Sequence, residues 1–142
     1  MLALPYVVKL LAGRDKSEAA LRQALAKKAY AFGEIDAAIA RVKALGYLDE
    51  TRFAQTKTRA LLRQKKTPSD IRRRLERDGL TAKIIDAVLE QETAGFDPVS
   101  AARALLAKKK ATGAKAARFL ASRGFDDEVI RAVVPGLADA DE

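Results

Sequence analysis

Few residues of this chain could carry out chemistry, and their types exclude most catalytic mechanisms. The 142 residues include no histidine and no cysteine, so the commonest general base and every thiolate metal ligand are missing. The serines therefore have no imidazole to activate them. The sequence also contains neither of the glycine-rich loops, Gly-x-x-x-x-Gly-Lys-Ser/Thr and Gly-x-Gly-x-x-Gly, that hold phosphates. We expect no enzyme, no cofactor and no metal site.

The acidic triplet Asp126-Asp127-Glu128 offers oxygen ligands of the kind that hard cations bind. The triplet closely follows Gly124, however, and precedes an apolar stretch, so that Asp126 is placed to cap a helix. Asp127 and Glu128 would then lie in the first turn, where acidic residues complement the helix dipole. We interpret the triplet as the start of a helix.

Basic residues provide the main functional signal. The net charge is +8, and residues 51–92 carry 11 basic but only 6 acidic residues. Such an excess is typical of proteins that bind a polyanion or an acidic partner. The candidate binding residues gather at two places in the chain: Arg59, Arg63, Lys65, Lys66, Arg72, Arg73, Arg74 and Arg77 at the first, and Lys108, Lys109, Lys110, Lys115 and Arg118 at the second.

Four of these arginines share one predicted helix, whose buried face comes from Ile71 and Leu75. Arginine rather than lysine matters here, because the planar guanidinium pairs with phosphate or carboxylate through two hydrogen bonds. At the helical period of about 100° per residue, the outward side then carries Arg73, Arg74 and Arg77, and Arg72 flanks its edge.

The elements that position these residues recur three times along the chain. A shift of 50 residues aligns Leu25 with Leu75, and a further shift of 45 aligns Leu75 with Leu120. Gly79 is aligned with Gly124 by the same second shift. Apolar positions recur while polar ones vary, which is the pattern of a repeated packing scheme.

Each repeat is predicted to contain three short helices with recognisable starts and stops. Thr67, followed by Pro68, caps the second helix of the central repeat, and Gly79 ends it. Thr81 caps the third helix in the same way. The first repeat is the least clear, because its opening helix is predicted only over Tyr6–Ala12, and Ala29 stands where the other repeats have glycine.

The sequence therefore predicts an all-α fold of three tandem three-helix repeats that form an elongated, curved array. The expected boundaries are residues 1–48, 49–93 (the most basic) and 94–137, followed by an acidic tail, 138–142, that is expected to be disordered. No apolar stretch approaches the roughly 20 residues of a membrane span. We expect a soluble, cytoplasmic monomer.

The segment Pro68–Gln91 has the outline of a helix-turn-helix, a motif whose second helix reads the major groove. Here the second helix carries one basic residue, Lys83, against Asp86 and Glu90. The arginines lie on the first helix, so sequence-specific reading of DNA is not expected. Non-specific contact with phosphates stays open.

Three blocks of the sequence resemble the RecX family. They are Leu10–Leu21 (LLAGRDKSEAAL), Gly46–Ala54 (GYLDETRFA) and Arg118–Phe125 (RFLASRGF). The resemblance implies a regulator of the RecA recombinase in bacterial DNA repair and the SOS response. It implies tandem three-helix units that bind the RecA filament on single-stranded DNA and inhibit recombination, ATP hydrolysis and co-protease activity. The basic residues would face the filament and its DNA.

Two other hypotheses remain open at the level of the sequence. One is a helical protein that binds nucleic acid non-specifically and has no RecA partner, in which case affinity should fall log-linearly with salt on bare DNA. The other is a helical adaptor whose basic face only increases solubility.

Overall fold

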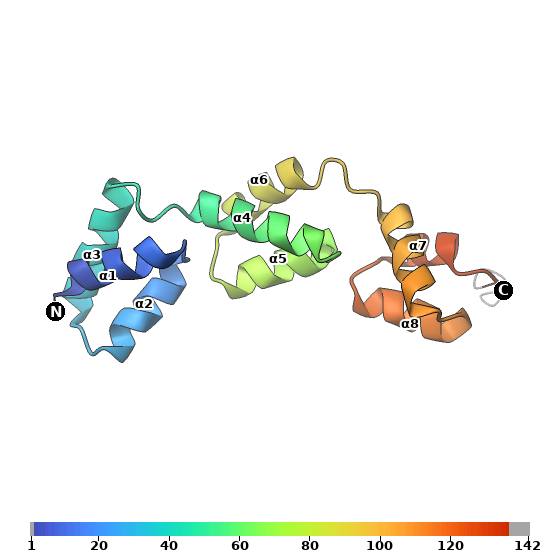
Figure 1. Ribbon diagram of the computed structural model, residues 1–142, viewed down its shortest axis with the longest axis horizontal. Coiled ribbons are helices and arrows are strands. Elements are labelled where there is room, and N and C mark those ends of the chain that lie inside the picture. The colour runs from blue at the N-terminus through green and yellow to red at the C-terminus, as the bar shows by residue number, and fades with distance from the viewer. Residues whose placement is uncertain (1, 137–142) are drawn as a thin grey trace.

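The computed structural model describes residues 2–136, and in this range the chain forms nine α-helices and no strand. Figure 1 shows an elongated array of three units in chain order. Unit 1 contains α1 (Ala3–Gly13), α2 (Glu18–Lys27) and α3 (Phe32–Ala44); unit 2 contains α4 (Glu50–Arg63), α5 (Pro68–Arg77) and α6 (Ala82–Glu92); unit 3 contains α7 (Pro98–Lys109), α8 (Gly113–Ser122) and α9 (Asp127–Val133). The predicted acidic tail lies outside the described residues.

Local capping explains where most of these helices begin. The hydroxyl of Thr67 accepts a hydrogen bond from the backbone N–H of Asp70, and Thr81 and Asp126 cap α6 and α9 in the same way. All three caps were predicted from the sequence and are confirmed. Each satisfies a backbone donor that the first turn of a helix leaves without an intrahelical partner.

The structure corrects the predicted start of the first helix in unit 1 and shows how Ala29 ends the second. The first helix begins at Ala3, not at Tyr6, and Pro5 lies within its first turn, where the missing proline N–H has no intrahelical acceptor to lose. Ala29 ends α2 as sharply as a glycine would, because it adopts the left-handed conformation with φ of +62°. A weak stop signal in the sequence therefore did not mean a weak stop in the structure.

Each unit has its own apolar core. The fully buried side chains include Leu21 and Leu25 in unit 1, Ile71 and Leu75 in unit 2, and Leu120 in unit 3. All extensive helix–helix contacts join helices of the same unit, with α1 against α3, α4 against α6, and α7 against α9 as the largest. The array is therefore held together by small joints between independent cores.

The two joints are built in the same way. At each joint, the glycine after the second helix of one unit packs against the start of the second helix of the preceding unit. A Cβ on Gly79 would lie 2.9 Å from the Cβ of Ala19, and a Cβ on Gly124 would lie 2.4 Å from the Oγ1 of Thr67. Both glycines also have positive φ, +83° and +94°. At the corresponding position of unit 1, Ala29 keeps a side chain at φ of +62°.

Polar contacts differ between the joints. Between units 1 and 2, Arg52 donates hydrogen bonds to the carboxylate of Asp15 from Nε and Nη2, at 3.0 and 2.9 Å, and the carboxylate of Glu50 accepts from the backbone N–H of Glu18 at 3.2 Å. Between units 2 and 3, the hydroxyl of Thr67 donates to the carbonyl of Arg123 at 2.7 Å.

The segment around Tyr47 connects units 1 and 2 and contributes side chains to both. Leu48 is buried in the core of unit 1, and Phe53 packs on the core of unit 2. Tyr47 contributes to the joint through its backbone, since its carbonyl accepts a hydrogen bond from Arg52, while its side chain is exposed.

Candidate binding surface

The arginines of α5 are less free than the helical period suggested. Arg73 donates to Asp70 at 2.6 Å, and Arg72 pairs with Asp86 on α6. Arg74 was predicted to point outward, but it is half-buried, and its Nε lies 3.4 Å from the carboxylate of Asp70 without a hydrogen bond. Arg74 is therefore only partly available at the surface.

Asp70 is the residue that organises this helix face. Burial raises the pKa of its carboxyl group, but the hydrogen bond from Arg73 and the charges of Arg73 and Arg74 lower it more, so the net pKa lies below the usual value. Asp70 is therefore ionised near neutral pH. Its single negative charge offsets part of the positive charge of Arg73 and Arg74. Arg73 and Arg74 therefore interact with a carboxylate in the first turn of α5 and are only partly available to a binding partner.

The other arginines of unit 2 differ in their pairing. Arg59 donates two hydrogen bonds to Glu92 on α6, at 2.9 and 2.8 Å, which lowers the pKa of that glutamate. Arg63 and Arg77, by contrast, are exposed and have no carboxylate partner among residues 2–136. They are the arginines of this unit that are available to a partner.

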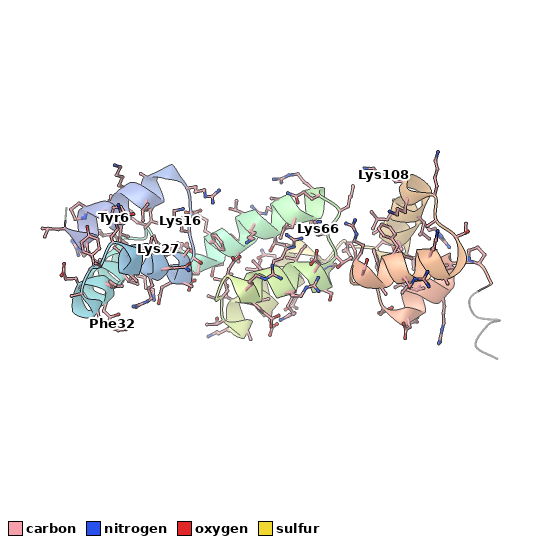
Figure 2. The ribbon with its side chains drawn as sticks, turned by 90° about the horizontal axis from the view of Figure 1, so that it is seen from below. Tyr6, Lys16, Lys27, Phe32, Lys66 and Lys108 are labelled. Atoms are coloured by element: carbon pink, nitrogen blue, oxygen red, sulfur yellow. The ribbon has the colours of Figure 1, made fainter. Side chains whose placement is uncertain are left out.

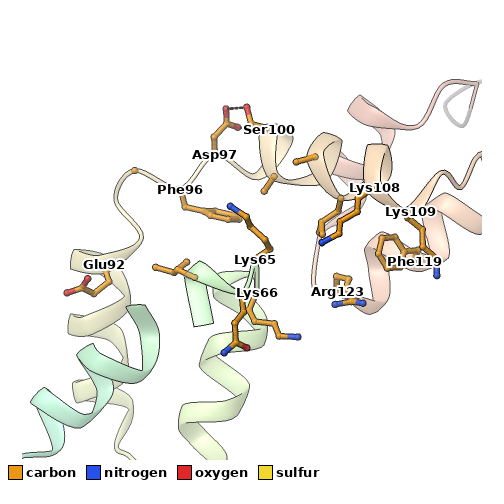
Figure 3. A pocket seen from close by; sticks show the side chains of 16 residues that line it. Lys65, Lys66, Glu92, Phe96, Asp97, Ser100, Lys108, Lys109, Phe119 and Arg123 are labelled. Carbon is orange, nitrogen blue, oxygen red and sulfur yellow. Dashed lines mark hydrogen bonds between the residues drawn. The ribbon is translucent and has the colours of Figure 1, made fainter. Parts of the chain in front are cut away.

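The structure brings two lysines from each predicted basic cluster to one place. Lys65 and Lys66 at the end of α4, together with Lys108 and Lys109 at the end of α7, line an open groove of about 950 Å³ between units 2 and 3, which we call the interunit groove. Figure 3 shows them approaching the groove from its two sides. Figure 2 shows Lys66 and Lys108 on the two units that flank the joint.

Three groove residues were missed by the sequence analysis. Phe96 precedes α7, and Phe119 and Arg123 come from α8 and its end. The ring of Phe119 lies beneath two cations, with Lys109 at 5.3 Å and Arg123 at 5.0 Å from its centroid. The spacing of Phe119 and Arg123 by one helical turn was a usable signal, but nothing in the sequence linked them to Lys65.

The electrostatic balance of the interunit groove is positive. Its two carboxylates are already engaged, because Glu92 pairs with Arg59 and Asp97 caps α7. The Ser100 hydroxyl donates to Asp97 at 2.7 Å, and this bond, followed by backbone N–H groups, lowers the pKa of that carboxyl group. The five cations lining the groove have no carboxylate partner within residues 2–136: Lys65, Lys66, Lys108, Lys109 and Arg123.

Two of the lysines adopt an uncommon backbone conformation. Lys65 ends α4 with φ of +67°, and Lys110 ends α7 with φ of +60°. The helix end at Lys65 is closed by hydrogen bonds from the Lys65 and Lys66 N–H groups to Leu62 and Leu61. Glycine is the usual residue at such an end, and a residue with a Cβ costs about 1 kcal/mol there.

The remaining predicted residues lie outside the interunit groove. Lys110, Lys115 and Arg118 are exposed on unit 3 and do not line it. The structure therefore separates the predicted set into cations of the groove, exposed cations outside it, and arginines held by carboxylates of unit 2.

Within the described part of the chain, no three acidic residues are grouped so that they could hold a metal ion, and no helix is long and apolar enough to cross a membrane. Asp126 is used as the cap of α9, as its position in the sequence predicted.

Stacked three-helix units with a basic groove at one joint define the chain as an all-helical tandem-repeat protein. A family model described as "RecX, first three-helix domain" matches residues 3–42. Regulatory protein RecX of Chlorobaculum tepidum is 36% identical over 141 residues, which cover 93% of this chain and 86% of that protein. Regulatory protein RecX from one strain of Thermus thermophilus is 35% identical, with 87% and 83% covered. The chain belongs to the RecX family of regulatory proteins.

Solved structures support the same fold. The crystal structure of RecX from Lactobacillus salivarius superposes with a TM-score of 0.77 over 96% of this chain and 94% of that chain, at 16% identity. A second crystal structure, described as regulatory protein RecX, gives a TM-score of 0.79 at 18% identity, with 92% and 70% covered. The three-repeat architecture predicted from the sequence is confirmed.

Proposed function

We propose that this chain binds the RecA filament on single-stranded DNA and inhibits its recombination, ATPase and co-protease activities. The observation that carries the proposal is the similarity to regulatory protein RecX along most of the chain. The elongated array (Figure 1) supports it, because stacked repeats offer an extended surface suited to a filament. In this proposal the chain acts by binding, without catalysis, as a monomer in the cytoplasm.

The proposed contact surface consists of the basic residues that the structure leaves without carboxylate partners in units 2 and 3. It comprises the cations of the interunit groove and, outside the groove, the exposed side chains of the other predicted residues: Arg63, Arg77, Lys110, Lys115 and Arg118. Arg59, Arg72, Arg73 and Arg74 would contribute less, because a partner must first compete with Glu92, Asp86 or Asp70.

The test is the rate of ATP hydrolysis by RecA on single-stranded DNA, with and without this protein. We expect the wild-type protein to inhibit. A variant with Lys66→Glu and Lys108→Glu should inhibit at least about tenfold more weakly, since two phosphate or carboxylate contacts of roughly 1 kcal/mol each become repulsive. The matched control carries Lys9→Glu and Lys27→Glu, which reverse two exposed charges on unit 1. A lack of inhibition by the wild type in excess over filament sites would refute the proposal.

A salt titration separates this proposal from non-specific binding to nucleic acid. Binding through phosphates alone predicts that affinity for bare single-stranded DNA falls log-linearly with salt and equals the affinity for the filament. We expect tighter binding to the filament than to bare DNA at every salt concentration. Equal affinities would favour the alternative function.

A further inference from the structure

The interunit groove combines an apolar wall with a charged rim. Ala101, Ala104 and Leu105 form a continuous face of α7 that lines it, and Leu62 lies opposite at the end of α4. Phe96 completes the apolar lining from the loop between the units (Figure 3). Residues at this helical spacing present a stripe of the kind into which apolar side chains of a peptide dock.

The charges around this stripe favour an anionic ligand. The five cations of the rim have no carboxylate partner among the described residues, whereas Glu92 and Asp97 are already engaged with Arg59 and with the start of α7. A ligand that brings carboxylates to the rim would meet its charges without displacing an existing ion pair.

The apolar lining fits a peptide better than it fits nucleobases. Single-stranded nucleic acid binds to open aromatic faces, on which its bases stack. In this groove the ring of Phe119 already carries Lys109 and Arg123 within about 5 Å of its centroid, which leaves Phe96 as the other aromatic ring of the lining. Aliphatic side chains such as Leu62 and Leu105 fill the rest.

Lys65 places its charge directly over the apolar lining of the interunit groove. Lys65 holds a left-handed conformation that glycine would adopt without strain, and its side chain extends toward Phe96 in the groove (Figure 3). The groove therefore has a positive charge next to one of its two aromatic rings.

We propose that the interunit groove binds an acidic peptide segment of a protein partner, with a large apolar side chain of the segment held between α7 and Phe96 and its carboxylates on the lysine rim. This inference builds on the proposed regulatory function and assigns one part of the surface to protein rather than DNA. It concerns Lys65, Lys66, Lys108, Lys109 and Arg123 as rim residues.

The test measures fluorescence anisotropy with the full chain and three labelled probes, without RecA. The probes are an acidic peptide with two leucines one helical turn apart, the same peptide with serines in place of leucines, and an oligodeoxythymidylate of equal charge. We expect the leucine peptide to bind at least about fivefold more tightly than either of the others, because only it uses both the stripe and the rim.

Two glycine variants make the test specific. Lys65→Gly removes the charge and relieves the backbone, so it should keep or raise the melting temperature while it weakens binding of the leucine peptide roughly fivefold. Lys110→Gly makes the same change at an equivalent helix end outside the groove, and it should alter affinity by less than about twofold.

Three outcomes would overturn the inference: equal affinity for the leucine and serine peptides, tighter binding of the oligonucleotide with the same sensitivity to Lys65→Gly, or equal losses in the two glycine variants. None of these outcomes affects the RecA ATPase assay, because the anisotropy measurement contains no RecA. Conversely, a peptide that binds as expected beside a RecA that is not inhibited would leave the groove assigned and refute the proposed function.

Discussion

Residues in the left-handed conformation differ in whether the surrounding structure leaves room for a side chain. At Gly79 and Gly124 the absence of a side chain is required by a neighbouring unit, whose atoms lie where a Cβ would be. At Ala29, Lys65 and Lys110 a side chain is present, and the chain bears the modest cost of the conformation. The conformation is therefore tolerated with a side chain at these three positions, whereas close packing excludes a side chain at Gly79 and Gly124.

This distinction predicts different costs for two similar substitutions. Gly46→Ala places a Cβ at φ of +76° with nothing within 4 Å, so it should cost about 1 kcal/mol of unfolding free energy. Gly124→Ala adds a clash with Thr67 at 2.4 Å and should cost about 1–3 kcal/mol more. Urea unfolding of the two variants measures the difference, and equal losses would show that the joint adapts freely.

For single residues, the sequence predicts interactions between positions that lie within one helical turn of each other. Thr67, Thr81 and Asp126 were identified as caps because the cap and the N–H that it satisfies lie within one turn. The engagement of Arg73 and Arg74 by Asp70 was missed, although their spacing of three and four residues is itself a local signal. A helical wheel predicts which way a side chain points, but it does not predict which neighbouring side chains it pairs with.

Among the elements, the start of α5 has two roles. The hydroxyl of Thr67 accepts from the Asp70 N–H and donates to the Arg123 carbonyl of unit 3, so one side chain both begins a helix and holds a joint. The corresponding Thr112 of unit 3 makes no side-chain capping bond.

The double role of Thr67 can be separated by substitution. Thr67→Val keeps the shape but loses both hydrogen bonds, and it leaves the carbonyl of Arg123 without this partner, so we expect a loss of about 1–3 kcal/mol. Thr67→Ser keeps both bonds and should lose less than about 1 kcal/mol. Thermal unfolding distinguishes the two variants. A valine variant as stable as the serine variant would mean that neither bond contributes.

The interunit groove illustrates what the sequence could not predict about the elements. The repeat placed Lys65 and Lys108 at equivalent helix ends of two units, which suggested two separate clusters. Their convergence on one groove depends on how unit 3 is turned relative to unit 2, and that is set by contacts such as Gly124 against Thr67. No periodicity within a repeat contains this information.

For the whole molecule, three separate cores predict that stability is divided among the units. Leu120 is fully buried in unit 3, so Leu120→Ala should destabilise that unit by about 2–5 kcal/mol. Hydrogen exchange should then show lost protection in α7–α9 and nearly unchanged protection in α1–α3. Equal loss of protection in all three units would show that the joints transmit stability along the array.

The joints also make the two ends of each unit different, so that the units can stack in only one orientation. Unit 1 presents a helix start to unit 2, and its own second helix is followed by Ala29, at the position where units 2 and 3 have glycine. Unit 2 has both halves, Gly79 toward unit 1 and Thr67 toward unit 3. A duplicated unit 2 would therefore carry matching ends for its own copy, so that an array lengthened by repeating this unit would keep both joint contacts.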